Sequence, residues 1–364
     1  MPGPETKVDG SRTPVWLYCA LTYRCPLACA TCPNPLDFER YAEAELATAE
    51  WLRVLEEARA LGTLQVAFTG GEAILRDDLE VLIDKARELQ LYSNLITGGV
   101  GLDSPRAVAL KDAGLNQVRI SLPAGDREHV DALTGAPAFD QKIAAARAVK
   151  AAGLPLLFTI TLCRDTIEQL PDILSLAERL GANMVEVTQV RPTTWAARNR
   201  EALSPSREQL AATRTWIADA SQRLKIFTAL DDGDSGRPQL CRNDWGTVRL
   251  TVSPDGTALP CRDAVAIGDL AFPNVREHDL DWIWHRSPAF NRFRGSDWMK
   301  VPCRDCPDKT VDYGGCRCQA YQLTGDAANA DPACALAPDH DLAWPQAGSR
   351  TPLVHRGSAI ETVT

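Results

Sequence analysis

The chain has 364 residues, of which 45% are hydrophobic and 24% charged, and a formal net charge of −9. These values are typical of a globular protein and exclude a disordered or fibrous chain. No stretch approaches the ~18 apolar residues of a membrane span, and the negative charge argues against nucleic acid or a membrane surface as a partner. The N-terminal stretch MPGPETKVDG lacks the apolar segment of a signal peptide, so we expect a cytoplasmic protein. Twelve cysteines in that compartment favour metal ligation or redox chemistry over disulfides.

Strand-like and helix-like segments alternate from residue 15 to residue 224. The apolar spacing predicts strands at 15–23, 64–68, 92–97, 117–122, 156–163 and 184–190, and helices at 45–61, 77–89, 104–113, 138–152, 167–180 and 206–224. The strands are too apolar to keep one face in water, which indicates a parallel sheet covered by helices. The predicted fold class is therefore α/β, with six units forming a partial (β/α)6 TIM-like barrel. In such folds the chemistry lies at the C-terminal ends of the strands.

The pattern changes in the last third of the chain. Ser253-Pro254-Asp255-Gly256 lies between two short strand-like segments, 247–252 and 257–260, and predicts a hairpin. From about residue 241 to residue 334 the chain is rich in Cys, Gly and Pro and has little helical periodicity. We expect a flexible leader at 1–13, the barrel at 14–230, a small metal-holding module at 231–340 and a loosely ordered tail at 341–364.

Cys25, Cys29 and Cys32 follow the first predicted strand with the spacing C-x3-C-x2-C. Three thiolates can hold three irons of a 4Fe–4S cluster and leave the fourth iron open for a small molecule, whereas a four-cysteine cluster serves electron transfer. The alternative is a zinc site, but structural zinc sites require four protein ligands. The spacing and its place after the first strand favour an iron–sulfur cluster.

This cysteine loop, together with Gly70-Gly71-Glu72 at the end of the second strand, resembles the radical S-adenosylmethionine (SAM) superfamily. The resemblance implies that the open iron binds the amino and carboxylate groups of SAM, and that one-electron reduction yields a 5′-deoxyadenosyl radical. The two glycines would expose backbone groups to the ligand, and Glu72 would accept a hydrogen bond from the SAM ammonium. Ser121, at the end of the fourth strand, is by the same resemblance a contact for the SAM ribose, or else an ordinary serine at a strand end.

The cysteines of the last third resemble the SPASM module, which carries two auxiliary iron–sulfur clusters of the 4Fe–4S or 2Fe–2S type. The resemblance assigns four ligands to each cluster, with Asp312 standing where the general pattern has cysteine; a carboxylate is a harder ligand and should raise the potential or the lability of its iron. The alternative is one or two zinc sites with a free thiol. The implied ligand sets are Cys241, Cys261, Cys316 and Cys318 for the first cluster, and Cys303, Cys306, Asp312 and Cys334 for the second.

Four further stretches resemble the PqqE family of pyrroloquinoline quinone (PQQ) biosynthesis: 94–97 (NLIT), 287–295 (SPAFNRFRG), 314–320 (GGCRCQA) and 323–328 (LTGDAA). That family joins Glu and Tyr side chains of a small precursor peptide. Departures from it occur around the expected substrate pocket, at 122–126 (LPAGD), at 190–195 (VRPTTW) and at Cys163, where the family has His. Matching cluster ligands beside an altered pocket predict a paralogue with a different substrate.

Cys163 ends the fifth predicted strand and, if it faces inward, can donate a hydrogen atom to a substrate radical. Our main expectation is therefore an epimerase that inverts one carbon of a sugar or other natural-product intermediate. The alternative for Cys163 itself is a structural role, as a small hydrophobic residue packed in the core. The alternatives are oxidative cross-linking of a precursor peptide and, without catalysis, an iron–sulfur electron carrier or redox sensor. Glu186, Gln189 and Arg191 are weaker candidates for substrate contacts. The expected partners are a sugar-like or peptide substrate, an electron donor such as flavodoxin or ferredoxin, and a peptide-carrier protein if the substrate is a peptide.

Overall fold

The computed structural model describes residues 13–231, 236–238, 241, 245–344 and 352–358. Its centre is a curved sheet whose strands follow the order β7-β6-β5-β4-β3-β2-β1-β8-β9. Every neighbouring pair is parallel except β8 and β9. The α/β fold class and the partial barrel are thus confirmed. The strands are β1 (Trp16–Thr22), β2 (Gln65–Gly70), β3 (Tyr92–Thr97), β4 (Gln117–Ser121), β5 (Leu156–Leu162), β6 (Met184–Gln189), β7 (Ile226–Ala229), β8 (Arg249–Val252) and β9 (Ala258–Leu259).

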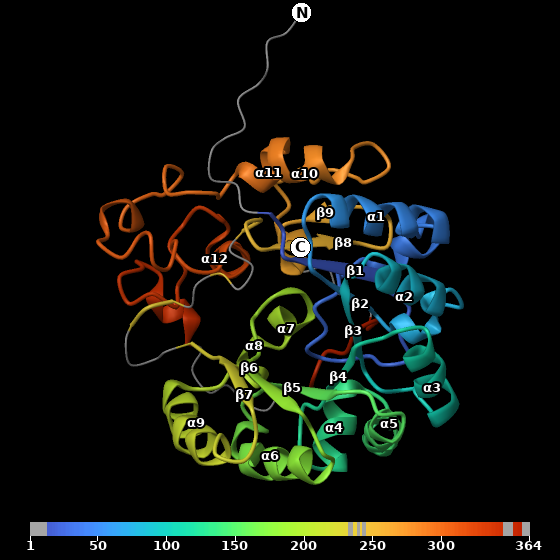
Figure 1. Ribbon diagram of the computed structural model, residues 1–364. Helices are drawn as coiled ribbons and strands as arrows, with labels where there is room; N and C mark the ends of the chain where they lie inside the picture. The colour runs from blue at the N-terminus through green and yellow to red at the C-terminus, as the bar shows by residue number, and fades with distance from the viewer. Residues whose placement is uncertain (1–12, 232–235, 239–240, 242–244, 345–351, 359–364) are drawn as a thin grey trace, which may run out of the picture.

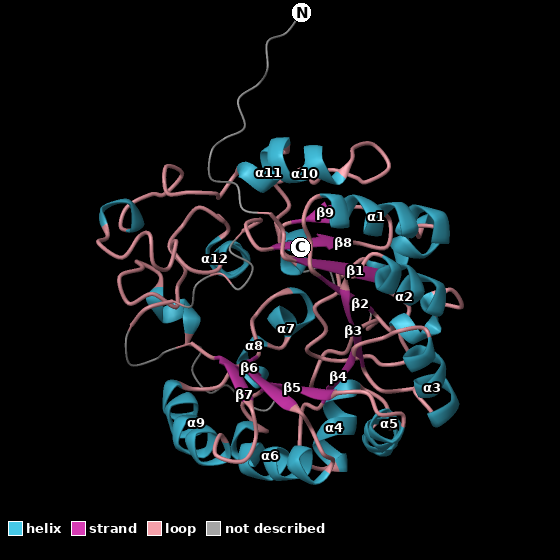
Figure 2. Cartoon of the chain, viewed as in Figure 1, coloured by secondary structure: helices cyan, strands magenta, loops and turns pink. Residues whose placement is uncertain are grey.

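Helices cover the convex side of the sheet, and α7 lies on the concave side (Figure 1). The strands appear as an arc that the two edge strands leave open (Figure 2). Along β5, Leu156, Phe158, Ile160 and Leu162 pack in the main core under the helices, so the alternate residues face the inside of the arc. The helices of this part are α1 (Thr48–Ala60), α2 (Leu79–Glu88), α3 (Ser104–Asp112), α4 (Arg127–Thr134), α5 (Phe139–Ala151), α6 (Leu170–Arg179), α7 (Thr194–Arg198), α8 (Arg200–Leu203) and α9 (Arg207–Ala220).

Several elements of the barrel differ from the sequence prediction, among them β7, α7 and α8, which were not predicted. The predicted hairpin does form, and its strand β8 pairs in parallel with β1, so that the hairpin extends the barrel sheet. Helix α4 was not predicted, because its eight residues include few apolar side chains. Its N-cap is Asp126, whose carboxylate accepts the backbone N–H of His129 at 3.0 Å, and its C-cap is Gly135, which has a φ of 64°.

The cysteine-rich part adds α10 (Leu280–Arg286), α11 (Pro288–Asn291) and α12 (Arg317–Thr324). Trp284 and Phe290 are buried in the main core of the barrel, and the backbone N–H of Leu280 donates to Glu57 of α1 at 2.9 Å. The expected boundary near residue 231 stays a prediction, and both this packing and the β8–β9 hairpin cross it.

The chain ends also bear on the expected organisation. The expected leader, 1–13, lies outside the described residues except for Thr13, as do 345–351 and 359–364 of the expected tail. Residues 352–358 of that tail are described and make hydrogen bonds to the barrel, while the expectation for the tail as a whole stays a prediction. In the described part of the chain, no helix combines the length and the apolar character that crossing a membrane requires.

Candidate radical SAM and iron–sulfur sites

The loop with Cys25, Cys29 and Cys32 leaves the C-terminal end of β1 and is held along its backbone. The N–H groups of Ala28 and Ala30 each donate at 2.9 Å to carbonyl groups in the last turn of α4. On the other side, Thr194 at the start of α7 donates its hydroxyl to the carbonyl of Cys32 at 2.8 Å. The loop is therefore fixed by backbone contacts, and its three thiols are left for ligation.

Burial is the dominant influence on these thiols. It raises the pKa of Cys25 and of Cys29 to about 11 and also raises the pKa of Cys32, while the positive charge of Arg356 opposes the increase at all three. Thiolates, the form that binds iron, would therefore form with the metal and not before it. The three cysteines fit the predicted cluster, since they share one partly enclosed loop and one neighbouring cation.

Gly70 and Gly71 place β2 directly against the start of the cysteine loop. A Cβ atom at Gly70, whose φ is 139°, would lie 2.1 Å from the carbonyl oxygen of Thr22. A Cβ atom at Gly71 would lie 2.4 Å from the carbonyl oxygen of Arg24. The N–H of Gly71 donates to the carbonyl of Thr22 at 2.6 Å and is therefore engaged within the protein, while the expectation that the glycines present backbone groups to the ligand stays a prediction. The two glycines permit close packing of backbones, and this packing positions Glu72.

Glu72 is fully buried, and its carboxylate lies between the C-terminal ends of β2 and β3. The hydroxyl of Thr97 lies 2.8 Å from both carboxylate oxygens, and the N–H of Gly98 donates to one of them at 2.8 Å. Burial raises the pKa of Glu72 to about 7, although these hydrogen bonds favour the charged form. The carboxylate is thus rigidly held and suited to accept a ligand ammonium.

Lys142 of α5 is a buried cation beside this carboxylate. Its side chain has an exposed fraction of 1%, and its Nζ atom donates to the carbonyl of Gly98 at 2.7 Å. Burial lowers the pKa of Lys142, while negative charge on Cys29, Glu72 and Cys25 acts in the opposite direction. A buried lysine next to an acid and two cluster thiols can hold the carboxylate of an amino-acid ligand.

The inner face of the barrel carries polar side chains. Arg119 of β4 and Glu186 of β6 form an ion pair across this face, and Thr159 of β5 donates to Glu186 at 3.3 Å. Ser121, the candidate ribose contact, is exposed at the end of β4, two residues beyond Arg119. Asn94 on β3 is buried, and no partner for its amide atoms is found among the described residues. This face can accommodate a polar substrate.

Cys163 directly follows β5 and has the parity of the residues that face the inside of the arc. Its exposed fraction is nevertheless 1%, because it packs among apolar side chains that include Ala30 of the cysteine loop and Leu203 of α8. Its thiol lies 3.7 Å from the carbonyl oxygen of Thr161, and burial raises its pKa to about 12. The structure thus encloses the proposed hydrogen donor in a small apolar cluster.

The four cysteines assigned to the first auxiliary cluster lie together. Cys316 and Cys318 flank the start of α12, Cys261 follows β9, and all four thiols, including that of Cys241, are buried. The pKa of Cys316 is held well below its usual range because the thiols of Cys241 and Cys318 donate hydrogen bonds to it. The fold therefore supplies one compact four-sulfur site.

The second auxiliary set also converges, and it is less buried. Burial raises the pKa of Cys303, and negative charge on Cys334, Asp312 and Cys306 raises it further, so the four groups are neighbours. The Oδ1 atom of Asp312 accepts the N–H of Gly314 at 2.8 Å, which leaves Oδ2 for a metal. No three described His, Cys, Asp or Glu side chains converge as closely as the ligands of one metal ion.

Buried charges around the auxiliary sites were missed by the sequence analysis. Arg317, between two ligands of the first cluster, donates to the carbonyl oxygens of Ala327 and Asn329 at 2.9 and 2.7 Å. Asp331 accepts the N–H of Cys316 at 2.7 Å and the amide of Gln319 at 2.8 Å. Lys142 and Arg356 were missed in the same way, because a lone Lys or Arg in a helix or a tail is normally a surface residue.

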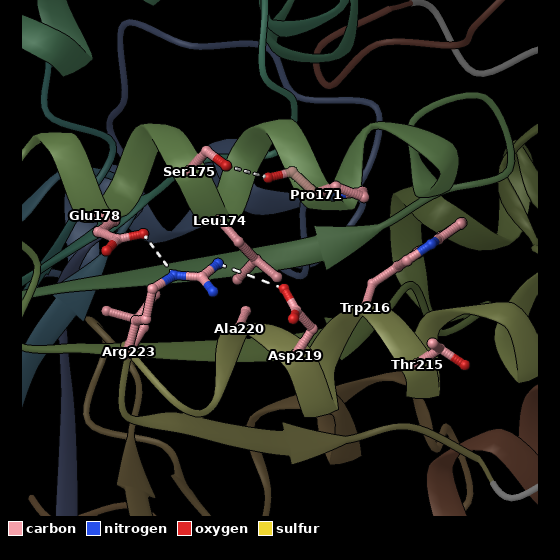
Figure 3. Close-up of a pocket in the computed structure, with 10 residues that line it drawn as sticks. Pro171, Leu174, Ser175, Glu178, Thr215, Trp216, Asp219, Ala220 and Arg223 are labelled. Atoms are coloured by element: carbon pink, nitrogen blue, oxygen red, sulfur yellow. Dashed lines mark hydrogen bonds and ion pairs between the residues drawn. The ribbon is translucent and has the colours of Figure 1, made fainter.

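A groove on the outside of the barrel lies between α6 and α9 and is unrelated to these sites (Figure 3). Arg223 pairs there with Glu178 at 3.4 Å and with Asp219 at 3.5 Å. The groove faces away from the concave side of the sheet, where the cysteine loop and Glu72 lie. We do not assign substrate to it.

Comparison with known proteins gives matches over most of the chain. Residues 20–177 match the Radical SAM superfamily, and residues 241–307 match the SPASM iron–sulfur cluster-binding domain. The PqqA peptide cyclase of Gluconobacter oxydans is 47% identical over 333 residues, which cover 90% of this chain and 92% of the relative.

Solved structures of low sequence identity share the fold. The structure of Streptococcus suis SuiB bound to precursor peptide SuiA matches with a TM-score of 0.72 and 17% identity, covering 90% of this chain and 76% of SuiB. The structure of anSMEcpe with bound AdoMet and the Cp18Cys peptide matches with a TM-score of 0.65 and 15% identity, covering 87% and 93% of the two chains.

Proposed function

Because the chain belongs to the radical SAM/SPASM family that includes the PqqA peptide cyclase, we propose that it cross-links side chains within a precursor peptide. The observation that carries this proposal is the 47% identity to a peptide cyclase over 90% of the chain. The enzyme uses SAM and iron–sulfur clusters. The proposed reaction removes two hydrogens from the peptide as a new bond forms between two of its side chains.

When bound, the cluster and SAM supply a 5′-deoxyadenosyl radical, and the auxiliary clusters supply an electron acceptor. The residues of this chain hold and orient these groups. Cys25, Cys29 and Cys32 would ligate three irons of the SAM cluster. Glu72 would accept hydrogen bonds from the SAM ammonium, and Lys142 would pair with the SAM carboxylate. Ser121 stays a proposed ribose contact on the same rim of the barrel.

The auxiliary ligands are proposals as well. Cys241, Cys261, Cys316 and Cys318 would hold the first auxiliary cluster, and Cys303, Cys306, Asp312 and Cys334 the second. Arg191 lies between β6 and the first of these sites, and its Nη2 atom lies 3.6 Å from Asp231. Burial alone would lower the pKa of Arg191, but the negative charges of Asp231, Cys316 and Cys241 hold this pKa above its usual value. Arg191 is therefore a buried positive charge between the barrel and the first auxiliary site.

Epimerisation, our main expectation from the sequence, receives less support than the peptide reaction. The closely similar relative is a cyclase, and two structural neighbours were solved with peptides. An epimerase also requires a donor thiol that reaches the substrate, and Cys163 is enclosed by apolar side chains. We therefore favour the alternative that the sequence had left open, with Cys163 as a packing residue. A sugar substrate and an antibiotic pathway have no support in these relatives.

The decisive experiment offers a PqqA-type precursor peptide to anaerobically reconstituted enzyme with SAM and a reductant. Mass spectrometry should find a peptide that has lost two hydrogens, together with 5′-deoxyadenosine in equal amount. The Cys32→Ala variant, which lacks one ligand of the SAM cluster, is the matched control and should give neither product. 5′-Deoxyadenosine with an unchanged peptide would refute this substrate class. Absence of SAM cleavage in the reconstituted protein would instead favour an electron carrier or sensor.

A further inference from the structure

Residues 352–358, here called the C-terminal strap, lie against the cysteine loop although they are more than 300 positions away in the sequence. The side-chain amide of Asn199 binds both backbone groups of one strap residue, Val354. Its Oδ1 atom accepts the N–H of Val354 at 2.7 Å, and its Nδ2 atom donates to the carbonyl of Val354 at 2.8 Å. The same Nδ2 atom donates to the carbonyl of Ala30 at 3.0 Å. One buried amide thus joins the strap to the loop that carries the cluster ligands.

The next two strap residues add contacts with α4 and with the loop itself. His355 lies 2.8 Å from the carbonyl oxygen of Ala132 in α4, and the N–H of Arg356 donates to the carbonyl of Ala28 at 3.2 Å. Leu353 packs against the apolar cluster that contains Ala30 and Cys163. The strap therefore follows the loop along its length and is placed by backbone, polar and apolar contacts together.

The side chain of Arg356 enters the site itself. Its exposed fraction is 7%, its guanidinium lies 3.9 Å from the centre of the Phe38 ring, and it donates to the carbonyl of Tyr23, two residues before Cys25. Arg356 therefore contacts the chain on both sides of Cys25, through its backbone at Ala28 and through its guanidinium at Tyr23. Its Nε atom is buried and has no hydrogen-bond partner in the described part of the chain. A buried N–H without a partner is costly and fits a site that a further acceptor completes.

We propose that the C-terminal strap is part of the SAM-cluster site and that Arg356 is a positioning residue for the cluster held by Cys25, Cys29 and Cys32. The proposal rests on the proposed function, because it requires a cluster in this loop. The guanidinium supplies a fixed positive charge and an N–H donor at the start of the loop that carries the three cysteines. Hydrogen bonds to cluster sulfurs, nearby charge and exclusion of solvent are the means by which a protein sets the potential of such a centre.

The expected consequence is a higher reduction potential for this cluster. Reduction adds negative charge to a centre that already carries it, and a buried cation stabilises the reduced state more than the oxidised state. The strap also covers the loop, so it should slow attack by oxygen and loss of iron. Both effects should disappear when the guanidinium is removed. The protection against oxygen and loss of iron should also disappear when the strap is released.

The test measures the midpoint potential of the SAM cluster by EPR-monitored redox titration of reconstituted protein. The signal that changes when SAM is added identifies this cluster among the three. Arg356→Gln should shift its midpoint to lower potential, whereas Arg356→Lys, which keeps the charge, should shift it less. Arg87→Gln, on the exposed face of α2, is the matched control and should leave the midpoint unchanged. Asn199→Ala should release the strap and increase the rate of iron loss in air.

An unchanged midpoint in Arg356→Gln with an intact cluster would overturn the proposal. If Arg356→Gln fails to assemble the cluster, Asn199→Ala decides: a rate of iron loss in air equal to that of the parent would also overturn the proposal, because the strap would then not protect the site. A parent protein that shows no SAM-responsive signal would instead refute the proposed function, with the strap left as a packing element. The readout is a potential, so a structural role alone would not reproduce the expected order of variants.

Discussion

The hydroxyl of Thr97 lies 2.8 Å from each carboxylate oxygen of Glu72, so the ends of β2 and β3 meet at one buried acid. A hydroxyl has one proton to donate, and the N–H of Gly98 donates to the same carboxylate. These contacts fix the orientation of the acid, while burial raises its pKa to about 7. The acid is therefore largely protonated below that pH and largely charged above it.

SAM affinity should rise with pH through about 7 in a manner that depends on Glu72. A raised carboxyl pKa means that the acceptor for the SAM ammonium is present in full only above that pKa. Glu72→Gln should weaken binding above pH 7 by roughly 10- to 150-fold, as expected for a hydrogen bond to a charged group worth about 1.5–3 kcal/mol. It should also remove this part of the pH dependence. Equilibrium dialysis of SAM from pH 6 to 8 checks both, and an unchanged profile in Glu72→Gln would contradict the assignment.

Lys142→Met should weaken SAM binding without destabilising the fold. Replacing a buried charge by an apolar side chain of similar volume is often neutral or stabilising, whereas losing the partner of a bound carboxylate costs roughly 10-fold or more in affinity. Calorimetric titration with SAM and thermal unfolding of the same samples separate the two effects. Lys150→Met, on the exposed face of the same helix, serves as the control. A lower melting temperature with unchanged SAM affinity would show that Lys142 is structural.

The spacing of the cysteines and the apolar alternation of the strands predicted the barrel and its site loop, because both patterns are local. Cys25, Cys29 and Cys32 needed only their own spacing and the strand before them. The sequence also predicted the convergence of the two auxiliary sets, although their ligands are distant, because the resemblance supplied the pairing. In each case a short pattern carries enough information to place the residue.

The rest depended on long-range packing that no short pattern encodes. Helix α4 has only eight residues, yet it holds the cysteine loop through two carbonyl groups of its last turn. The strap looked like an unstructured tail because its partners, Asn199 and the loop at Ala28, lie far away in the chain. Lys142 has an ordinary helical sequence around it, and only the fold shows that it is buried with its ammonium on the carbonyl of Gly98, whose N–H binds Glu72. Burial of a charge is a tertiary property.

Asp312→Cys should lower the midpoint potential of the second auxiliary cluster and slow its loss of iron in air. A thiolate is a softer and more strongly donating ligand to iron than a carboxylate. Asp312→Ala should have the opposite effect on iron content, because one ligand is then missing. Iron and sulfide analysis after timed exposure to air gives the order of the three proteins. If Asp312→Ala retains its clusters as well as the parent does, Asp312 is not a ligand and only caps the turn at Gly314.

Cys163→Ala should keep the peptide reaction and lose a small amount of stability. Its thiol is enclosed with Ala30 and Leu203, and removing one buried sulfur from such a cluster costs about 1 kcal/mol in the free energy of unfolding. Denaturant unfolding of the cluster-free protein measures that cost, and mass spectrometry of the peptide in deuterated water measures the reaction. Cys19→Ala, at a fully buried position of β1, is the matched control for packing. Loss of turnover in Cys163→Ala alone, with SAM cleavage intact, would restore Cys163 as a hydrogen donor. A solvent deuterium retained at a carbon in the parent reaction would point the same way.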